Sequence, residues 1–175
     1  MLKMLKDNRD LLFKIFVISG IFGFIYEEIF YYFDLGYLVK RGSTFGPWIP
    51  IYAFGGVMIY LGCNKLKNKP LYIFLLASVI AGVLEFLIGY YLWHFRSLRL
   101  WDYNTEMLNF GNIGGYVCLR SVLFFGISGL LLFYVILPAI NKINVKFNNS
   151  INKYVTNILF CLFVIDIIIS WIIVK

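Results

Sequence analysis

The segment Leu71–Phe95 reads LYIFLLASVIAGVLEFLIGYYLWHF, and its only acidic residue is Glu85. A helix needs about 20 predominantly apolar residues to cross a hydrocarbon core of roughly 30 Å. Polar residues do not alternate with apolar ones at period two, as they would in a strand of a membrane barrel. The segment is therefore predicted to be a membrane-spanning helix.

Similar apolar runs lie on both sides of this segment. The predicted spans are Ile15–Phe33, Trp48–Asn64, Leu71–Phe95, Val117–Ile140 and Tyr154–Val174. The composition agrees, because 61% of the residues are hydrophobic and only 14% are charged, whereas soluble domains have about 25% charged residues. The first run lacks a small-residue cleavage site and is expected to be an anchor. The sequence predicts an all-α polytopic bundle of about five helices, with residues 1–175 forming a single transmembrane domain.

Basic residues cluster in alternate connections and predict the orientation. One side carries Lys3, Lys6, Arg9, Lys14, Lys65, Lys67, Lys69, Lys142, Lys146 and Lys153. The other side carries Lys40, Arg41, Arg96, Arg99 and Lys175, together with the acidic residues Asp34, Asp102 and Glu106. By the positive-inside rule, the amino terminus is expected to be cytoplasmic and the carboxyl terminus outside the cell membrane. Because the clusters lie between apolar runs, the net charge of +7 indicates contact with anionic lipid and not with nucleic acid.

The chain lacks the residue patterns of common cofactor sites. The single His94 and the scattered Cys63, Cys118 and Cys161 supply no ligand set for zinc or iron. Only Cys118 is expected to face the oxidising side, so no intrachain disulfide is predicted. No glycine-rich phosphate loop is present, and the chain is not expected to hydrolyse ATP itself. The sequence therefore predicts no metal and no cofactor.

Four ionisable residues within the spans carry the most information: Glu27, Glu85, Arg120 and Asp166. At 1.5 Å per helical residue, all four fall in the outer half of the bilayer. Charges at this depth cost a few kcal/mol, so such residues face the bundle interior and find partners. We expect Arg120 to pair with Glu27 or Glu85, either as a structural ion pair or as part of a functional site. Asp166 has a polar neighbour on the same helical face, Ser170, which lies four residues later.

Small residues share a helical face with each glutamate. Gly20, Gly23, Glu27 and Tyr31 recur on one face of the first span, and Ser78, Gly82, Glu85 and Gly89 recur on one face of the third. Small residues let membrane helices approach closely. Both glutamates are therefore predicted to lie along packing seams.

The two outer connections, Arg41–Tyr52 and Trp101–Arg120, are rich in glycine and aromatic residues. Each follows a helix that carries a glutamate and leads into a helix that returns inward. This layout predicts a cap of two segments packed against each other over a cavity, with a tandem duplication of a two-helix hairpin. The alternative is an aromatic belt at headgroup level with ordinary turns.

The stretch from Gly20 to Pro138 resembles the CmpB-like, or type IV, family of ABC-transporter permeases. The most specific matches are Gly46-Pro47-x-x-Pro50-Ile51-Tyr52 and Trp101-Asp102-Tyr103, followed by Asn112 to Arg120. The chain departs from the family pattern at Gly114-Gly115-Tyr116 and at Phe125. The family-like core is expected over about residues 15–140, with an additional helix over about 154–174. The resemblance implies a membrane partner of a separate cytoplasmic ATPase.

These observations favour a membrane transport component, permease-like or substrate-binding, with its site in the outer half of the bundle. The predicted ligand-binding residues are Glu27, Glu85, Arg120, Tyr52, Trp101, Asp102, Tyr103 and Asn112. The alternative is an intramembrane enzyme acting on a lipid or lipid-linked substrate at the outer leaflet. An ATPase would dock on the short inner connections, where Ile143, Val145 and Phe147 could form a brief amphipathic helix. Five helices are few for a translocation path, so a homo-oligomer or heteromer is expected.

Overall fold

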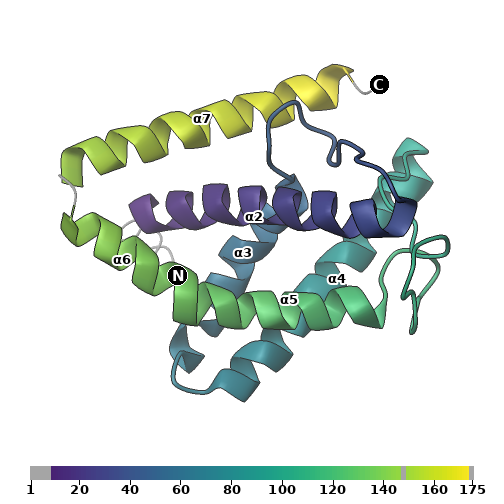
Figure 1. Cartoon of the computed structure of the whole chain (residues 1–175), viewed down its shortest axis with the longest axis horizontal. Coiled ribbons are helices and arrows are strands. Elements are labelled where there is room, and N and C mark those ends of the chain that lie inside the picture. Colours follow the sequence, from purple (N-terminus) through teal and green to yellow (C-terminus); the bar gives the residue numbers. More distant parts are fainter. Residues whose placement is uncertain (1–8, 147–148, 174–175) are drawn as a thin grey trace. The chain divides into compact units, whose positions relative to one another are not determined.

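The computed structural model describes residues 9–146 and 149–173, and within these ranges the chain is helical with no β-strand (Figure 1). The α-helices are α2 (Arg9–Leu35), α3 (Pro50–Cys63), α4 (Pro70–Arg96), α5 (Leu119–Leu131), α6 (Leu137–Lys146) and α7 (Asn149–Ile173). A 3₁₀ turn, η1 (Asn64–Leu66), follows α3, and a π-helical stretch, η2 (Leu132–Ile136), joins α5 to α6. The predicted all-α class is confirmed.

Among the described residues, three helical runs are long and apolar enough to cross a bilayer: Pro70–Arg96, Leu119–Ile143 and Asn152–Ile173. The other two predicted spans are also helical, as α2 and α3. The 14 residues of α3 rise roughly 21 Å, which is less than the hydrocarbon core. A crossing of the bilayer by α2 and α3 stays a prediction.

Prolines set helix boundaries and irregularities. Pro70 occupies the first turn of α4, where its missing N–H would have no helical partner. Pro50 is the first residue of α3, two residues after the predicted start of the second span at Trp48. Pro138 cannot donate to the carbonyl of Tyr134, which lies four residues earlier. This accounts for the π-helical stretch directly before it.

The chain divides into two compact units. Unit 1 comprises Met1–Val57 and Ile136–Lys175, and unit 2 comprises Met58–Val135. Unit 1 contains α2 and the first part of α3, whereas unit 2 contains the end of α3 together with α4 and α5. The predicted tandem duplication of a two-helix hairpin, and with it a pseudo-twofold relation between the copies, stays a prediction.

In unit 1, α7 lies alongside α2 (Figure 1). The fully buried Phe163 of α7 packs where Gly20 of α2 has no side chain, and Tyr52 of α3 packs against Gly23. A Cβ at either glycine would overlap these rings. The predicted small-residue face of α2 is therefore an internal seam of this unit.

In unit 2, α4 packs along α5. Gly126 of α5 lies against Ser78 and Phe74, and Gly82 of α4 lies against Val122. Gly89 accommodates Trp101 and Tyr116 of the outer connection. The predicted seam on α4 is thus confirmed.

Some predicted features fall outside the described part of the chain. Lys3, Lys6 and Lys175, used for the orientation, lie there, and so does Phe147. Ile143 is described and lies in α6, which continues the fourth predicted span. The proposed amphipathic helix at this connection stays a prediction.

A candidate ligand site around Glu85

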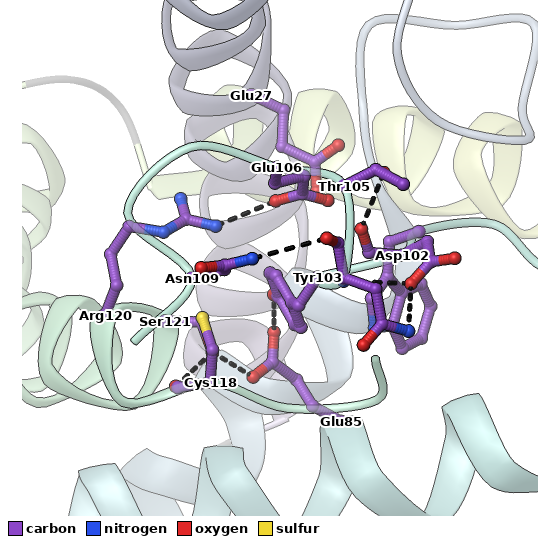
Figure 2. Close-up of polar contacts among 12 residues, drawn as sticks. Glu27, Glu85, Asp102, Tyr103, Thr105, Glu106, Asn109, Cys118, Arg120 and Ser121 are labelled. Atoms are coloured by element: carbon purple, nitrogen blue, oxygen red, sulfur yellow. Dashed lines mark hydrogen bonds and ion pairs between the residues drawn. The ribbon is translucent and has the colours of Figure 1, made fainter. Parts of the chain in front are cut away.

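A carboxyl group is buried at the centre of the polar contacts of unit 2 (Figure 2). Glu85 of α4 is 4% exposed. Its Oε1 accepts a hydrogen bond from the Tyr103 hydroxyl at 2.6 Å, and its Oε2 accepts one from the Ser121 hydroxyl at 2.5 Å. These donors come from the outer connection and from α5, so Glu85 joins three segments of the unit.

Tyr103 remains a hydrogen-bond donor over the whole physiological pH range. Burial, and after it the charge of Glu85, raises the pKa of the Tyr103 phenol well above its ordinary value. Because the folded-state pKa is raised, the contribution of the protonated Tyr103 phenol to folding stability is fully present below the ordinary tyrosine pKa. It decreases as the pH rises above the ordinary tyrosine pKa and is fully lost once the pH passes the higher folded-state pKa.

Arg120, at the start of α5, forms an ion pair with Glu106 of the outer connection. Arg120 Nη2 and Glu106 Oε2 are 2.8 Å apart, with side chains 12% and 5% exposed. The guanidinium carbon lies 5.4 Å from the ring centre of Tyr103, within range for a cation–π contact. The sequence predicted Glu27 or Glu85 as the partner, and the structure provides Glu106. A pairing of Arg120 with Glu27, which would join the two units, stays a prediction.

The remaining predicted ligand residues of unit 2 hold the connection in shape. Trp101 Nε1 donates to the Tyr116 carbonyl at 2.9 Å. Asp102 accepts bonds from the backbone and side chain of Asn104, and Asn112 Nδ2 donates to Asn104 Oδ1 at 2.7 Å. We therefore interpret Trp101, Asp102 and Asn112 as framework residues that present Tyr103 and Glu106.

An apolar groove runs along the α4–α5 hairpin. It has a volume of about 440 Å³ and is lined almost entirely by apolar atoms. Its walls include Gly82 and Phe86, which flank Glu85 on α4, and Leu119, which precedes Arg120 on α5. The groove belongs to the same hairpin as the polar cluster, but its walls include none of Glu85, Tyr103, Glu106, Arg120 and Ser121.

Glu27 and Tyr52 belong to unit 1. Glu27 Oε2 lies 3.2 Å from Arg41 Nε, and Glu28 Oε1 accepts the Arg41 backbone N–H at 2.7 Å. The Arg41 guanidinium lies 3.5 Å from the ring centre of Tyr31. The first outer connection is thus fixed to a glutamate-bearing helix, as the second is by Tyr103. The predicted grouping of Glu27 and Tyr52 with Glu85, and the packing of the two connections together, stay predictions.

Two residues of the cluster were missed by sequence reasoning, Ser121 and Glu106. Ser121 lies on the buried face of α5 with Phe125 and Gly129, at i, i+4 and i+8, so the spacing used for α4 would have found it. Glu106 had no such signal, because its approach to Arg120 depends on the fold of an irregular connection.

The cluster combines two carboxylates, one guanidinium and two hydroxyls in a largely water-excluded place. Such groups can bind the polar end of a ligand or exchange protons with it. Among the described residues, no group of three metal-ligating side chains was found.

Comparison with known proteins relates this chain to one protein family. Neither the curated proteins nor the solved structures contain a match to this chain. The family model described as "Putative ABC-transporter type IV" matches residues 14–171. This match extends beyond Pro138, where the motif resemblance ended, and takes in most of α7 with Asp166. The chain is therefore a membrane protein that belongs to this ABC-transporter-type family.

Proposed function

We propose that the protein is the membrane component of a transporter, permease-like or substrate-binding, and that the Glu85 cluster is its ligand site. The observation that supports this is a buried carboxyl inside a spanning helix, held by donors from a second helix and from an outer connection. A ligand that altered these bonds would change how the connection sits on the hairpin. Ionisable residues at membrane depth commonly mark substrate pathways.

The apolar groove on the same hairpin and the Arg120 guanidinium together support an amphipathic ligand with an anionic end. Its apolar part would occupy the groove between α4 and α5. Its head would replace the Glu106 carboxylate at Arg120, so one anion exchanges for another on the same guanidinium. Glu106 would then be free to move into water together with the outer connection. Ligand binding would thereby loosen this connection from α5.

The family membership supports a separate ATPase as partner, since the sequence shows no nucleotide-binding loop. The basic connection at Lys65–Pro70 would face the cytoplasm and provide one docking surface. Its cations suit an acidic patch on the ATPase. A second copy of the chain, or another membrane subunit, would complete the translocation path.

A lipid-modifying enzyme is the second candidate, and the two buried carboxylates Glu85 and Glu106, in the same unit as an apolar groove, are what favour it. Glu85 and Glu106 could act as general acid and base while Arg120 holds a phosphate. An enzyme would convert the amphiphile without ATP. A transporter would return the amphiphile unchanged. In that case, the ligand should stimulate ATP hydrolysis by the partner ATPase, and Glu85→Gln should reduce this stimulation.

Binding of matched amphiphiles tests the site. Dodecyl phosphate and the neutral dodecyl maltoside share one chain and differ in the head group, and both are added to the full chain in neutral detergent. Dodecyl phosphate should bind with higher affinity than dodecyl maltoside, and Arg120→Gln should abolish the difference. Glu106→Gln should increase the affinity for dodecyl phosphate, because it removes the competing carboxylate. Lys67→Gln, which removes a cation on the inner connection, should change neither affinity. Equal binding of both amphiphiles would rule out anion recognition at Arg120.

A further inference from the structure

Asp166 attaches the first outer connection to α7. Its Oδ1 accepts hydrogen bonds from the Phe45 backbone N–H at 2.9 Å and from the Ser170 hydroxyl at 3.1 Å. Its Oδ2 accepts bonds from the Gly46 backbone N–H and from the Trp48 indole N–H, each at 2.7 Å. All of these residues belong to unit 1. Each carboxylate oxygen therefore has two donors.

The three N–H groups of the connection require an acceptor and tolerate no donor. N–H groups donate hydrogen bonds and cannot accept them. A carboxylate can serve all three at once, whereas an amide of the same shape would direct its NH₂ toward at least one of them. Bonds from N–H groups to an ionised carboxylate are also stronger than bonds between neutral groups. The arrangement thus favours a carboxylate over an amide of the same shape.

Apolar packing holds the indole in place for this contact. Trp48 is 8% exposed, and its ring stacks on Phe163 of α7 with centres 4.6 Å apart and planes 16° apart. Phe163 lies three residues before Asp166, on the same helical face. The Thr44 hydroxyl donates to the Trp48 carbonyl at 2.6 Å. Both α7 and the connection are therefore shaped around the carboxylate.

We propose that Phe45, Gly46 and Trp48 form a carboxylate-binding site in the outer connection, and that Asp166 is its built-in ligand. Through this bond, α7 acts as a latch that fixes the connection leading into α3. The proposal is independent of the Glu85 cluster, which lies in unit 2.

Hydrogen exchange in the full chain tests the latch. Asp166→Asn should speed exchange at the Phe45 and Gly46 amides and at the Trp48 indole by about 10- to 100-fold, the effect of losing one or two hydrogen bonds to a carboxylate. Amides of α4 and α5 should exchange as before. The matched control is Ser170→Ala, which removes a donor to the same carboxylate and leaves the acceptor in place. It should change the three rates far less.

Chemical rescue tests whether the donors form a carboxylate site. Asp166→Ala leaves the three N–H groups without their ligand but leaves space beside them. Sodium formate should restore slow exchange at these groups as its concentration rises, and sodium chloride at equal ionic strength should not. In the wild-type chain, formate should have little effect, because Asp166 is tethered and competes.

Two results would overturn the proposal. One is unchanged exchange at all three groups in both Asp166 variants, and the other is rescue by chloride equal to rescue by formate. If the variants do not fold, hydrogen exchange at the indole N–H groups of the ¹⁵N-tryptophan-labelled wild-type chain still tests the proposal. Its indole signals come from four tryptophans, and Trp48→Phe identifies the relevant one. A Trp48 indole proton that exchanges freely in the wild-type protein would refute the bond to Asp166.

Discussion

Glu85 is compatible with a spanning helix because its oxygens are matched by donors that the fold supplies. A buried polar group without partners costs a few kcal/mol, and a buried charge costs more. Tyr103 and Ser121 each provide one hydroxyl to it at short distance. The unit therefore depends on these donors for stability, and any ligand that exchanges with them can move the connection.

Removing a single hydroxyl should expose this dependence. Tyr103→Phe deletes one donor to Glu85 and should lower the free energy of unfolding by about 1–3 kcal/mol, the cost of losing a hydrogen bond to a buried charged group. Tyr37→Phe is the matched control, because Tyr37 is 60% exposed, and it should have no effect. Unfolding by denaturing detergent measures both. Equal stability of the two variants would mean that the Tyr103–Glu85 bond contributes nothing.

The Arg120–Glu106 pair should behave as a buried ion pair. Arg120→Gln alone removes the ion-pair partner of the buried Glu106 carboxylate and should cost about 3–5 kcal/mol, and the double variant with Glu106→Gln should recover part of that loss. The pair formed by Arg99 and Asp102, 3.0 Å apart but more exposed, provides the comparison. Arg99→Gln should cost only about 0–1 kcal/mol for its ion pair. A double variant as unstable as the sum of the two singles would argue against the coupling.

At the scale of the elements, glycines determine how closely the helices of each unit approach. Gly20 and Gly23 admit rings from α7 and α3 into the surface of α2, and Gly126 admits Ser78 and Phe74 into α5. Small residues at helix crossings are typical of membrane bundles, where close contact replaces the hydrophobic effect.

Alanine substitution separates a packing glycine from one without a packing role. The Cβ of Gly23→Ala would overlap Tyr52 and should destabilise unit 1 by about 1–3 kcal/mol, as overpacking does. Gly55→Ala, in α3, is the control, since a Cβ there meets no atom within 4 Å. It should be neutral or stabilising by up to about 1 kcal/mol, because alanine favours helix. The reverse order of stability in a detergent unfolding assay would refute the seam between α2 and α3.

The helices and their buried faces could be predicted from the sequence, because they follow from local periodicity. The seams of Gly20 with Glu27 and of Gly82 with Glu85 are read directly from helical spacing. The partners could not be predicted in the same way. Glu106 reaches Arg120, and Phe45 reaches Asp166, through irregular connections whose paths depend on tertiary contacts. The role of Trp48 could not be predicted for the same reason, since it precedes α3 and packs on Phe163 of α7.

At the scale of the whole molecule, the basic clusters predict which connections face the cytoplasm. A cysteine placed at Asn104, in an otherwise cysteine-free variant, should react with an impermeant maleimide added to intact cells. A cysteine at Asn68 should react only after the membrane is permeabilised. The opposite pattern would reverse the orientation and place the Glu85 cluster in the inner half of the bilayer.

The central claim is that the cluster around Glu85 binds an anionic amphiphile, and a structure of the protein with dodecyl phosphate in a lipid nanodisc tests it most directly. We predict phosphate density within hydrogen-bonding distance of Arg120, the dodecyl chain in the groove between α4 and α5, and Glu106 displaced from its present distance of 2.8 Å. A structure with saturating dodecyl phosphate in which Arg120 remains paired with Glu106, and in which neither the cluster nor the groove holds ligand density, would contradict the claim.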